Sequence, residues 1–257
     1  MPVVAALLES RDAAQALRRS LPRSNWSLAR CRNPNALRRV LATRLVDAIV
    51  LSPQALAQPQ IQEVRATFPG VPMVAFGPFR PDDGEMMLAC HEAKVAALLV
   101  EGVDNAVSGE VVLRVSAAEE RRRTLADAPR ALRLTDPVQR DVWDYLLERV
   151  DQTVRTGALA QRLKISREHL SRQFGAGGAP NLKRVIDLTR IACAAQLLRN
   201  PGYDAGTTAR LLRFATSSHL TITARRIAGA SASGLASMGP RGVLAAFARG
   251  NTRSRIR

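Results

Sequence analysis

A short pattern occurs twice in the second half of the chain, and it constrains the fold of that half more than any other feature. Residues 159–166 and 208–215 place apolar side chains at the same positions, 49 residues apart. Beyond the turn, His169 matches His219 at an offset of 50, which predicts one extra residue in the second turn. Two copies of a short helix, a tight turn and a second helix are typical of a repeated helix-turn-helix motif.

The segment between the two copies favours one long helix. Residues 182–199 contain no Gly or Pro, and Asn200, Pro201 and Gly202 follow as a termination signal. At about 1.5 Å per residue, a helix of this length extends roughly 27 Å. Such a spacer could hold two recognition helices in successive major grooves, whose centres lie about 34 Å apart.

These features resemble the DNA-binding domain of AraC/XylS-type transcription regulators over residues 138–234. The first motif reads LAQRLKISREHLSRQF at residues 159–174, and residues 177–180 (GGAP) lead into the long helix. The resemblance implies a module that binds asymmetric promoter sites on double-stranded DNA and contacts RNA polymerase. It implies DNA-binding residues on the second helix of each motif: Arg167, Glu168, His169, Ser171, Arg172, Ser217, Ser218, Thr221, Arg225 and Arg226.

Within the first motif, Arg172 is the best candidate for a bidentate contact to guanine. His169 is open to three interpretations: a phosphate contact, a helix cap or a structural role. In the second motif Ile222 stands where relatives of this type commonly have a base-contacting Arg, and Ala224 replaces a core Phe. We therefore expect Arg225 and Arg226 to contact phosphates there, with more backbone positioning than base reading.

Two turn positions depart from the usual pattern. Lys164 and Arg213 stand where Gly is common. A left-handed backbone at either position would cost roughly 1 kcal/mol.

The positive charge is concentrated in the second half. Residues 1–129 hold 16 Lys and Arg against 14 Asp and Glu, whereas residues 130–257 hold 22 against 8. No acidic residue follows Asp204. A GC-rich coding sequence would raise the Arg content throughout, but it would not produce this asymmetry. The distribution indicates a polyanionic partner for the second half.

The first half alternates short apolar runs with amphipathic helical patterns. Residues 3–8, 26–31, 48–51, 73–76 and 96–100 are predicted as strands. Continuous apolar strands separated by helices favour a parallel sheet covered on both faces. The arrangement resembles the receiver domain of bacterial response regulators, a doubly wound, flavodoxin-like α/β fold with strand order 2-1-3-4-5.

The residues needed for receiver phosphorylation are largely missing. Glu9 is a single acid where receivers have a pair, and Ser52 stands where the phosphorylated Asp would follow the third strand. Gly77 replaces the hydroxyl residue, and Glu101 with Gly102 replaces the Lys. Without an acceptor, metal ligands and a cation the site cannot transfer a phosphoryl group by this chemistry. We expect a pseudo-receiver that serves docking, ligand sensing or homodimer formation.

These patterns predict four segments. Residues 1–127 form a receiver-like regulatory domain and 128–134 a linker, and either the Thr135 hydroxyl or the Asp136 carboxylate caps the next helix. Residues 135–238 form an all-α domain with two helix-turn-helix motifs joined by a long helix, and 239–257 form a flexible basic tail.

Other classes of protein are disfavoured. Cys31, Cys90 and Cys193 are scattered, which favours free thiols in a reducing cytoplasm. None has metal-ligand spacing with a His, so we expect no metal or cofactor. The longest uncharged apolar runs, such as 95–100, fall far short of the roughly 18 residues of a membrane span, and the N-terminus lacks the basic region of a signal peptide.

The favoured function is a DNA-binding transcriptional regulator. The alternative is a non-catalytic interaction protein whose drifted, Arg-rich helix-turn-helix domain binds nucleic acid without specificity. An enzyme is disfavoured, because no nucleophile, base or metal set clusters in the sequence.

Overall fold

The computed structural model of the protein describes residues 2–22, 26–55 and 58–253. The chain divides into an N-terminal unit, Met1–Glu120 with Asn200–Gly202, and a C-terminal unit, Arg121–Arg199 with Tyr203–Arg257. The boundary falls inside helix α6 (Ala117–Thr124), earlier than the expected one after residue 127.

The expected linker at residues 128–134 is corrected by the structure. This segment contains helix α7 (Ala128–Ala131), and its side chains Ala128, Leu132 and Leu134 are buried. Burial of these three apolar side chains stabilises the fold. In an exposed linker the same side chains would stay in contact with water.

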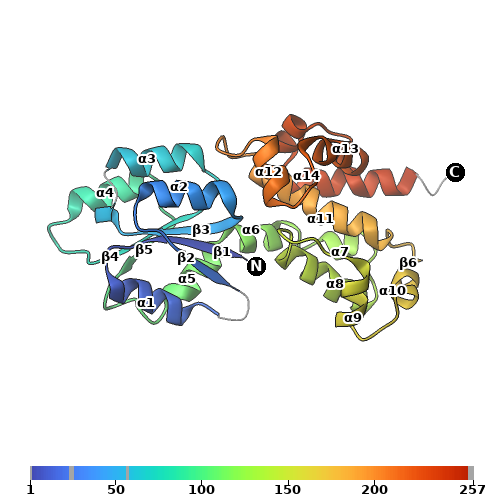
Figure 1. Cartoon of the computed structure of the whole chain (residues 1–257), viewed down its shortest axis with the longest axis horizontal. Helices are drawn as coiled ribbons and strands as arrows, with labels where there is room; N and C mark the ends of the chain where they lie inside the picture. The colour runs from blue at the N-terminus through green and yellow to red at the C-terminus, as the bar shows by residue number, and fades with distance from the viewer. Residues whose placement is uncertain (1, 23–25, 56–57, 254–257) are drawn as a thin grey trace. The chain divides into compact units, whose positions relative to one another are not determined.

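The N-terminal unit is built on a five-stranded parallel sheet with the order β2-β1-β3-β4-β5, as predicted. Helices α1 and α5 cover one face of the sheet, and α2, α3 and α4 cover the other (Figure 1). The strands are β1 (Val3–Leu7), β2 (Ser27–Arg30), β3 (Val46–Leu51), β4 (Met73–Gly77) and β5 (Ala97–Val100). The helices are α1 (Arg11–Ser20), α2 (Pro34–Thr43), α3 (Gln58–Thr67), α4 (Gly84–Glu92) and α5 (Ser108–Val115), with a short 3₁₀ turn η1 at Pro53–Ala55.

Local sequence explains these elements. Every residue of β1, β3 and β4 is buried, as expected for central strands covered on both faces. Ser10 caps α1 by accepting hydrogen bonds from the backbone N–H groups of Asp12 and Ala13. Asn33 caps α2 in the same way, with Pro34 in the first turn.

The C-terminal unit consists of helices, as predicted, with one short extended segment, β6. Of the two predicted cap residues, Thr135 and Asp136, it is Asp136 that caps α8, in a capping box with Gln139. The elements after α7 are α8 (Pro137–Glu148), α9 (Thr156–Arg162), α10 (Arg167–Gln173), β6 (Phe174–Gly177), α11 (Leu182–Leu197), α12 (Ala205–Leu211), α13 (Ser217–Ala228) and α14 (Ala232–Arg253).

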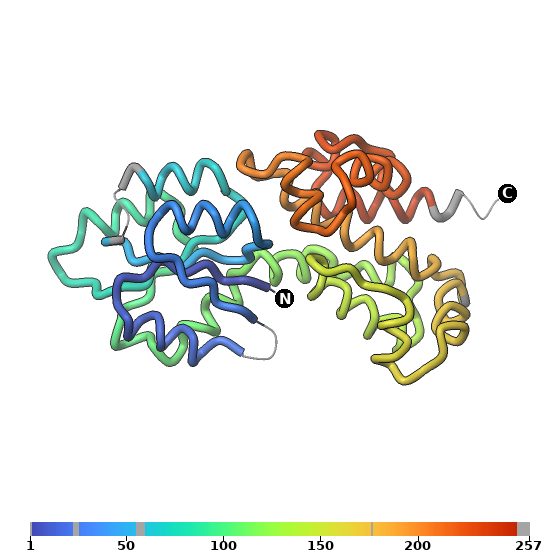
Figure 2. The backbone as a smooth tube through the Cα atoms, viewed as in Figure 1, coloured from blue at the N-terminus to red at the C-terminus, as the bar shows by residue number. Residues whose placement is uncertain are grey.

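Helix α11 forms the core of this unit, and its side chains are buried around most of its circumference. Helices α9 and α10 lie towards its N-terminal end, and α12 and α13 follow its C-terminal end (Figure 2). At about 1.5 Å per residue its 16 residues extend roughly 24 Å. The observed helix is therefore slightly shorter than the sequence suggested.

The predicted flexible tail is wrong for residues 239–253, because they belong to α14. This helix packs along α11, and its side chains Val243, Leu244 and Phe247 are buried. The guanidinium carbon of Arg184 on α11 lies 4.7 Å from the centre of the Phe247 ring. A kink at Gly239, where φ is 62°, separates the two halves of α14. Residues 254–257, the end of the predicted tail, lie outside the described residues.

Candidate nucleic-acid interface

The first helix-turn-helix motif is formed by α9 and α10. Leu159 and Ala160 on α9 are buried, and the backbone N–H of Ile165 donates to the carbonyl of Ala160 at 3.1 Å. This hydrogen bond closes the turn through Lys164, whose φ is 55°. Ser166 then caps α10, because its Oγ accepts from the backbone N–H of His169 at 3.0 Å.

The second motif, formed by α12 and α13, repeats this geometry. The backbone N–H of Phe214 donates to Ala209 O at 2.8 Å, and Arg213 has a φ of 58°. Thr216 caps α13 by accepting from His219 N at 3.0 Å. The connection 212–216 is one residue longer than 163–166, so the predicted insertion in the second turn is confirmed.

The left-handed turn residues allow a test of stability. We expect Lys164→Gly to raise the free energy of unfolding by about 0.5–1 kcal/mol, because Gly removes a left-handed cost of roughly 1–2 kcal/mol but loses more chain entropy. Urea unfolding measures the change. The matched control, Lys164→Ala, removes the same long side chain and keeps the backbone cost. Equal stability of the Gly and Ala variants would contradict the argument.

Helix α10 presents most of its predicted DNA-binding residues to solvent. Leu170 is buried and anchors the helix, Gln173 is half-buried, and the other side chains are exposed. The exposed candidates are Arg167, Glu168, His169, Ser171 and Arg172. Within residues 2–22, 26–55 and 58–253, neither Arg167 nor Arg172 has an acidic partner within salt-bridge distance.

The structure narrows the role of His169. The cap of α10 is supplied by Ser166, so the capping interpretation of the His169 side chain is wrong. Its Nε2 lies 3.3 Å from Nε2 of Gln173, one helical turn further along. The imidazole is exposed and remains available for a phosphate contact.

Helix α13 exposes polar, charged and apolar side chains to solvent. Leu220, Thr223, Ala224 and Ile227 are buried, whereas Ile222 is 64% exposed. The predicted residues Ser217, Ser218, Arg225 and Arg226 are exposed, and Thr221 is half-buried with its Oγ1 donating to Ser217 O at 3.1 Å.

Arg226 differs from its predicted role as a free phosphate contact. Its Nη2 lies 2.6 Å from Oδ2 of Asp187 on α11, and the Asp187 side chain is 12% exposed. A charge-assisted hydrogen bond of this kind holds the guanidinium against the protein. Arg226 therefore ties α13 to α11, although half of its side chain is still exposed.

The long helix also fixes the turn of the second motif. Nε and Nη2 of Arg190 donate to the carbonyl of Leu212 at 3.2 and 2.7 Å. The guanidinium carbon lies 3.8 Å from the centre of the Phe214 ring. Burial, opposed by the nearby Asp187 carboxylate, lowers the pKa of Arg190. Arg190 thus satisfies a carbonyl that the end of α12 leaves without a helical partner.

Two further contacts position the motifs. Nε2 of the buried Gln139 on α8 donates to Gln173 O at 2.6 Å, which holds the end of α10. Asp204 caps α12, where its Oδ1 accepts from the Thr207 backbone at 2.6 Å, and this hydrogen bond lowers the pKa of Asp204. Sequence reasoning missed the role of Gln139. A buried polar residue at a core-facing helix position was the available signal.

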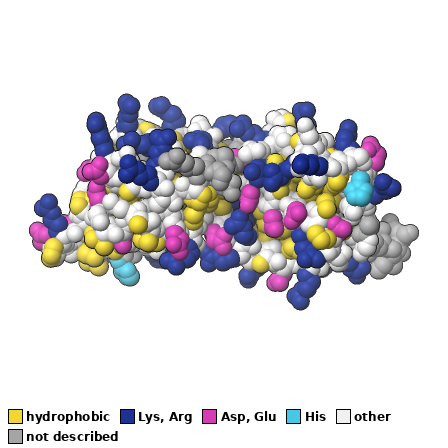
Figure 3. Space-filling view, turned by 90° about the horizontal axis from the view of Figure 1, so that it is seen from below, with side chains coloured by type: hydrophobic (Ala, Val, Ile, Leu, Met, Phe, Trp, Pro, Cys, Tyr) yellow, Lys and Arg dark blue, Asp and Glu magenta, His cyan; other side chains and the backbone are white. Residues whose placement is uncertain are grey.

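The excess of positive charge belongs to the C-terminal unit. The N-terminal unit holds 13 Lys and Arg and 13 Asp and Glu, whereas the C-terminal unit holds 25 and 9. Figure 3 shows Lys and Arg side chains over the visible face of each unit. A local cluster in the N-terminal unit must therefore be balanced by acids elsewhere in that unit, whereas the C-terminal unit attracts polyanions as a whole.

The carboxyl edge of the sheet holds Ser52, Glu9 and Glu101, the residues compared above with the phosphorylation site of receivers. Ser52 follows β3 and is buried, with its Oγ donating to Phe76 O at 3.2 Å and accepting from Glu9 N at 3.3 Å. Ser10 donates to the Glu101 carboxylate. The part of the chain that the structure describes contains no group of three or more His, Cys, Asp or Glu side chains arranged for a metal ion.

No protein-family model and no curated protein sequence matches this chain. Among solved structures, full-length FixJ from B. japonicum aligns at 12% identity over 88% of this chain and 96% of its own, with a TM-score of 0.36. The Salmonella typhimurium RcsB response regulator, described for its conformational dynamism in DNA interaction, aligns at 13% identity over 73% and 98%, with a TM-score of 0.36. Likeness at this level does not establish a shared function. No helix within the described ranges is long and apolar enough to span a bilayer.

Proposed function

We propose that this protein is a transcriptional regulator that binds double-stranded DNA through two helix-turn-helix motifs. The observation that carries the proposal is the pair of motifs with the same left-handed turn and the same side-chain cap, each with an outward-facing second helix. Both motifs lie in the unit that holds the whole excess of positive charge. Phosphate attraction then supplies affinity, and side chains in the major groove supply specificity.

Helix α10 is the base-reading helix in this proposal. Arg172 contacts O6 and N7 of a guanine through its forked guanidinium, and Ser171 beside it hydrogen-bonds to a neighbouring base edge. Arg167, in the first turn of α10, contacts a phosphate together with His169. Glu168 accepts a hydrogen bond from a cytosine amino group. All five side chains are exposed in the structure.

Helix α13 makes a different set of contacts. Ser217 and Ser218 at its start and Arg225 near its end bind phosphates, with Thr221 between them and Arg226 directly after Arg225. Ile222 exposes an apolar side chain in the middle of this helix, and in this proposal it contacts the methyl group of a thymine. The site that the protein selects should therefore carry a thymine facing α13.

The N-terminal unit is proposed to regulate or dimerise without accepting a phosphoryl group. Ser52 lacks the carboxylate that receiver chemistry needs, and its hydroxyl is held by the Phe76 carbonyl. Incubation with a small phosphoryl donor is expected to leave the mass of the protein unchanged. Contact with RNA polymerase by the DNA-bound protein is part of the same proposal.

A homodimer is proposed to form through the surface around α4 and the edge strand β5. Exposed large apolar side chains gather there: Met87, Leu88, Leu98, Val103 and Val107 are 40–77% exposed. A second copy of the chain would remove this surface from water. Leu88→Glu is expected to shift sedimentation from dimer to monomer. A chain that sediments as a monomer at all concentrations would contradict the proposal.

The decisive experiment selects duplexes from a random library with the full chain. The proposal predicts one enriched sequence made of two unequal parts, with centres about one duplex turn apart. Inserting about 5 base pairs between the parts turns the second part to the opposite face and should abolish the contribution of α13. Inserting a full duplex turn between the parts keeps both on the same face of the DNA and tests whether the two motifs can span the longer distance. Library sequences that remain random after selection, with equal affinity for every duplex, would contradict the proposal.

The alternative function is a non-catalytic interaction protein that binds nucleic acid without specificity. One observation favours it: the second motif has Ile222 at a position where a base-contacting Arg is usual, while its charge is concentrated in Arg225 and Arg226. The selection separates the two functions, because non-specific binding enriches no sequence.

A further inference from the structure

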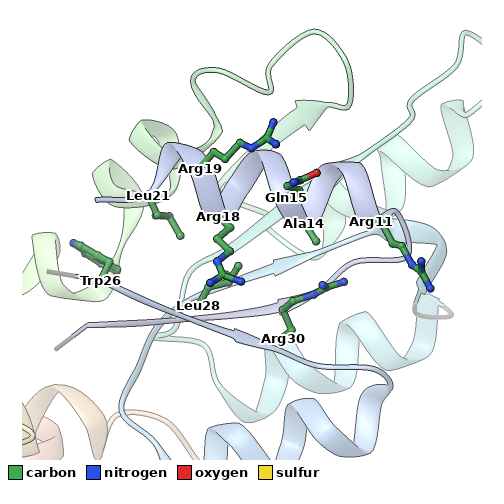
Figure 4. Close-up of a pocket in the computed structure, with 9 residues that line it drawn as sticks. All are labelled: Arg11, Ala14, Gln15, Arg18, Arg19, Leu21, Trp26, Leu28 and Arg30. Atoms are coloured by element: carbon green, nitrogen blue, oxygen red, sulfur yellow. The ribbon is translucent and has the colours of Figure 1, made fainter. Parts of the chain in front are cut away.

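A pocket in the N-terminal unit lies between α1 and the edge strand β2, away from both helix-turn-helix motifs in the sequence. Its volume is about 810 Å³. Pockets of roughly 300–1,000 Å³ are typical of small-molecule sites. The polar and aromatic side chains that line it are Arg11, Gln15, Arg18, Arg19, Trp26 and Arg30 (Figure 4).

The spacing of these residues explains why they meet. Arg11, Gln15 and Arg18 are four and three residues apart, so they share one face of α1. Ala14 and Leu17 on the same helix are buried against the sheet. Arg30 lies on the edge strand, so its side chain has no further strand beside it. The helix face and the strand edge together form a pocket wall of guanidinium groups.

Figure 4 shows how the side chains are arranged along the pocket. Arg18 points from α1 towards β2 and lies near Arg30. Arg11 lies at one end of the pocket, and Trp26 lies at the other. Arg18 is seven positions after Arg11 on α1, which corresponds to about 10 Å along the helix. The pocket therefore offers cations along its length and an indole ring at one end.

The charge of the pocket is not balanced locally. Four Arg line it, and no Asp or Glu does. Among the described residues, none of these four guanidinium groups has an acidic side chain within salt-bridge distance. The N-terminal unit as a whole has equal numbers of basic and acidic residues, so general basicity does not explain the cluster. Like charges gathered in one concavity repel one another, and an anionic ligand relieves that repulsion.

We propose that this pocket binds a nucleotide carrying two or more phosphate groups. Guanidinium groups form paired hydrogen bonds with phosphate oxygens, which suits Arg11, Arg18 and Arg30. An indole ring stacks on a nucleobase, and Trp26 is half-buried at the end of the same pocket. A nucleic-acid strand is less well matched, because tracking a long backbone needs a continuous basic stripe rather than a bounded pocket. Ligand binding here would give the N-terminal unit a signal that does not depend on phosphorylation.

The test uses the full chain, guanosine 5′-triphosphate, adenosine 5′-triphosphate and inorganic triphosphate as probes, at a salt concentration near 0.15 M. At least one nucleotide should bind with a Kd below about 1 mM and quench the fluorescence of Trp26; the second Trp, Trp143, is buried. Trp26→Phe should remove the quenching. Arg18→Ala combined with Arg30→Ala should weaken binding at least tenfold. Both Arg side chains are exposed, so circular dichroism should remain unchanged.

The matched control is Arg39→Ala, an exposed Arg on α2 outside the pocket, which should leave nucleotide affinity unchanged. Equal losses in the control and the double variant would overturn the proposal, because they would indicate diffuse attraction. Two other results would overturn it. One is inorganic triphosphate binding as tightly as the nucleotides. The other is a single-stranded oligonucleotide competing at the same residues with higher affinity. None of these measurements depends on DNA binding by the C-terminal unit, so the failure of either proposal is distinguishable.

Discussion

Raising the salt concentration from about 50 mM to about 200 mM is expected to weaken binding to the selected DNA site by roughly a thousandfold. Each phosphate that a cation neutralises releases condensed counterions, and this release becomes less favourable as salt rises. If about six phosphates are neutralised, the logarithm of the affinity falls with the logarithm of salt at a slope near −5. Fluorescence anisotropy at five or six salt concentrations measures this slope.

Variants make the salt experiment specific to the interface. Arg225 is exposed at the end of α13, and Arg225→Ala should reduce the slope by about one. Arg39→Ala, in the N-terminal unit, changes the net charge equally and should leave the slope unchanged. A flat response to salt would show that the protein does not track the phosphate backbone.

The helix-turn-helix motifs were predictable because their geometry depends on local sequence. The backbone carbonyls of Ala160 and Ala209 accept the hydrogen bonds that close the two turns. Ser166 and Thr216 cap the helices that follow. These interactions span five residues or fewer, so matched residues give matched turns. The one-residue insertion was visible for the same reason, since an offset of 49 before the turn becomes 50 after it.

The strand order of the N-terminal unit was predictable for a different reason. Strands that are buried on both faces are mostly apolar, and β1, β3 and β4 contain no polar side chain other than the buried Asp47 in β3. Right-handed crossovers between parallel strands leave few arrangements for five such strands separated by helices. The edge strands β2 and β5 are only partly buried, but the largest error at a strand end was at the start of the central strand β3, where the buried Asp47 interrupts the apolar pattern.

The contacts that hold α13 and α14 in place were not predictable from the sequence. Arg226 reads as a free cation in the sequence, but its partner Asp187 is 39 residues away, on another helix. Residues 239–257 were predicted as a basic tail because they contain five Arg and no acidic residue, although Val243 and Phe247 are spaced four residues apart and pack inward. Both predictions were wrong because they counted charged residues. What decides the structure is which face of each helix packs against the protein and which faces solvent.

Arg190 is a positioning residue whose contacts cannot be predicted from the sequence alone. Its role depends on the Leu212 carbonyl and the Phe214 ring, which only the fold brings near. Arg190 contacts the second motif and leaves its outward surface free. Any change to it alters the placement of α13 rather than the chemistry of recognition.

Arg172 carries the second large expected effect. Arg172→Ala should cost about 1–3 kcal/mol on the selected site, which corresponds to roughly 5- to 150-fold in Kd, and much less on random DNA. The reason is that a paired hydrogen bond to guanine is lost, whereas non-specific binding loses a single screened charge. Competition titrations with both duplexes measure the two losses.

Arg172→Lys separates base reading from charge. Lysine keeps the positive charge but cannot reproduce the fork geometry, so affinity for random DNA should be retained while affinity for the selected site falls. Replacing the contacted guanine by adenine should weaken binding of the unaltered protein and have little effect on the Arg172→Ala variant. Equal losses on selected and random duplexes would assign Arg172 to the phosphate backbone, and base reading by α10 would then rest on Ser171 and Glu168, both of which are also exposed on this helix.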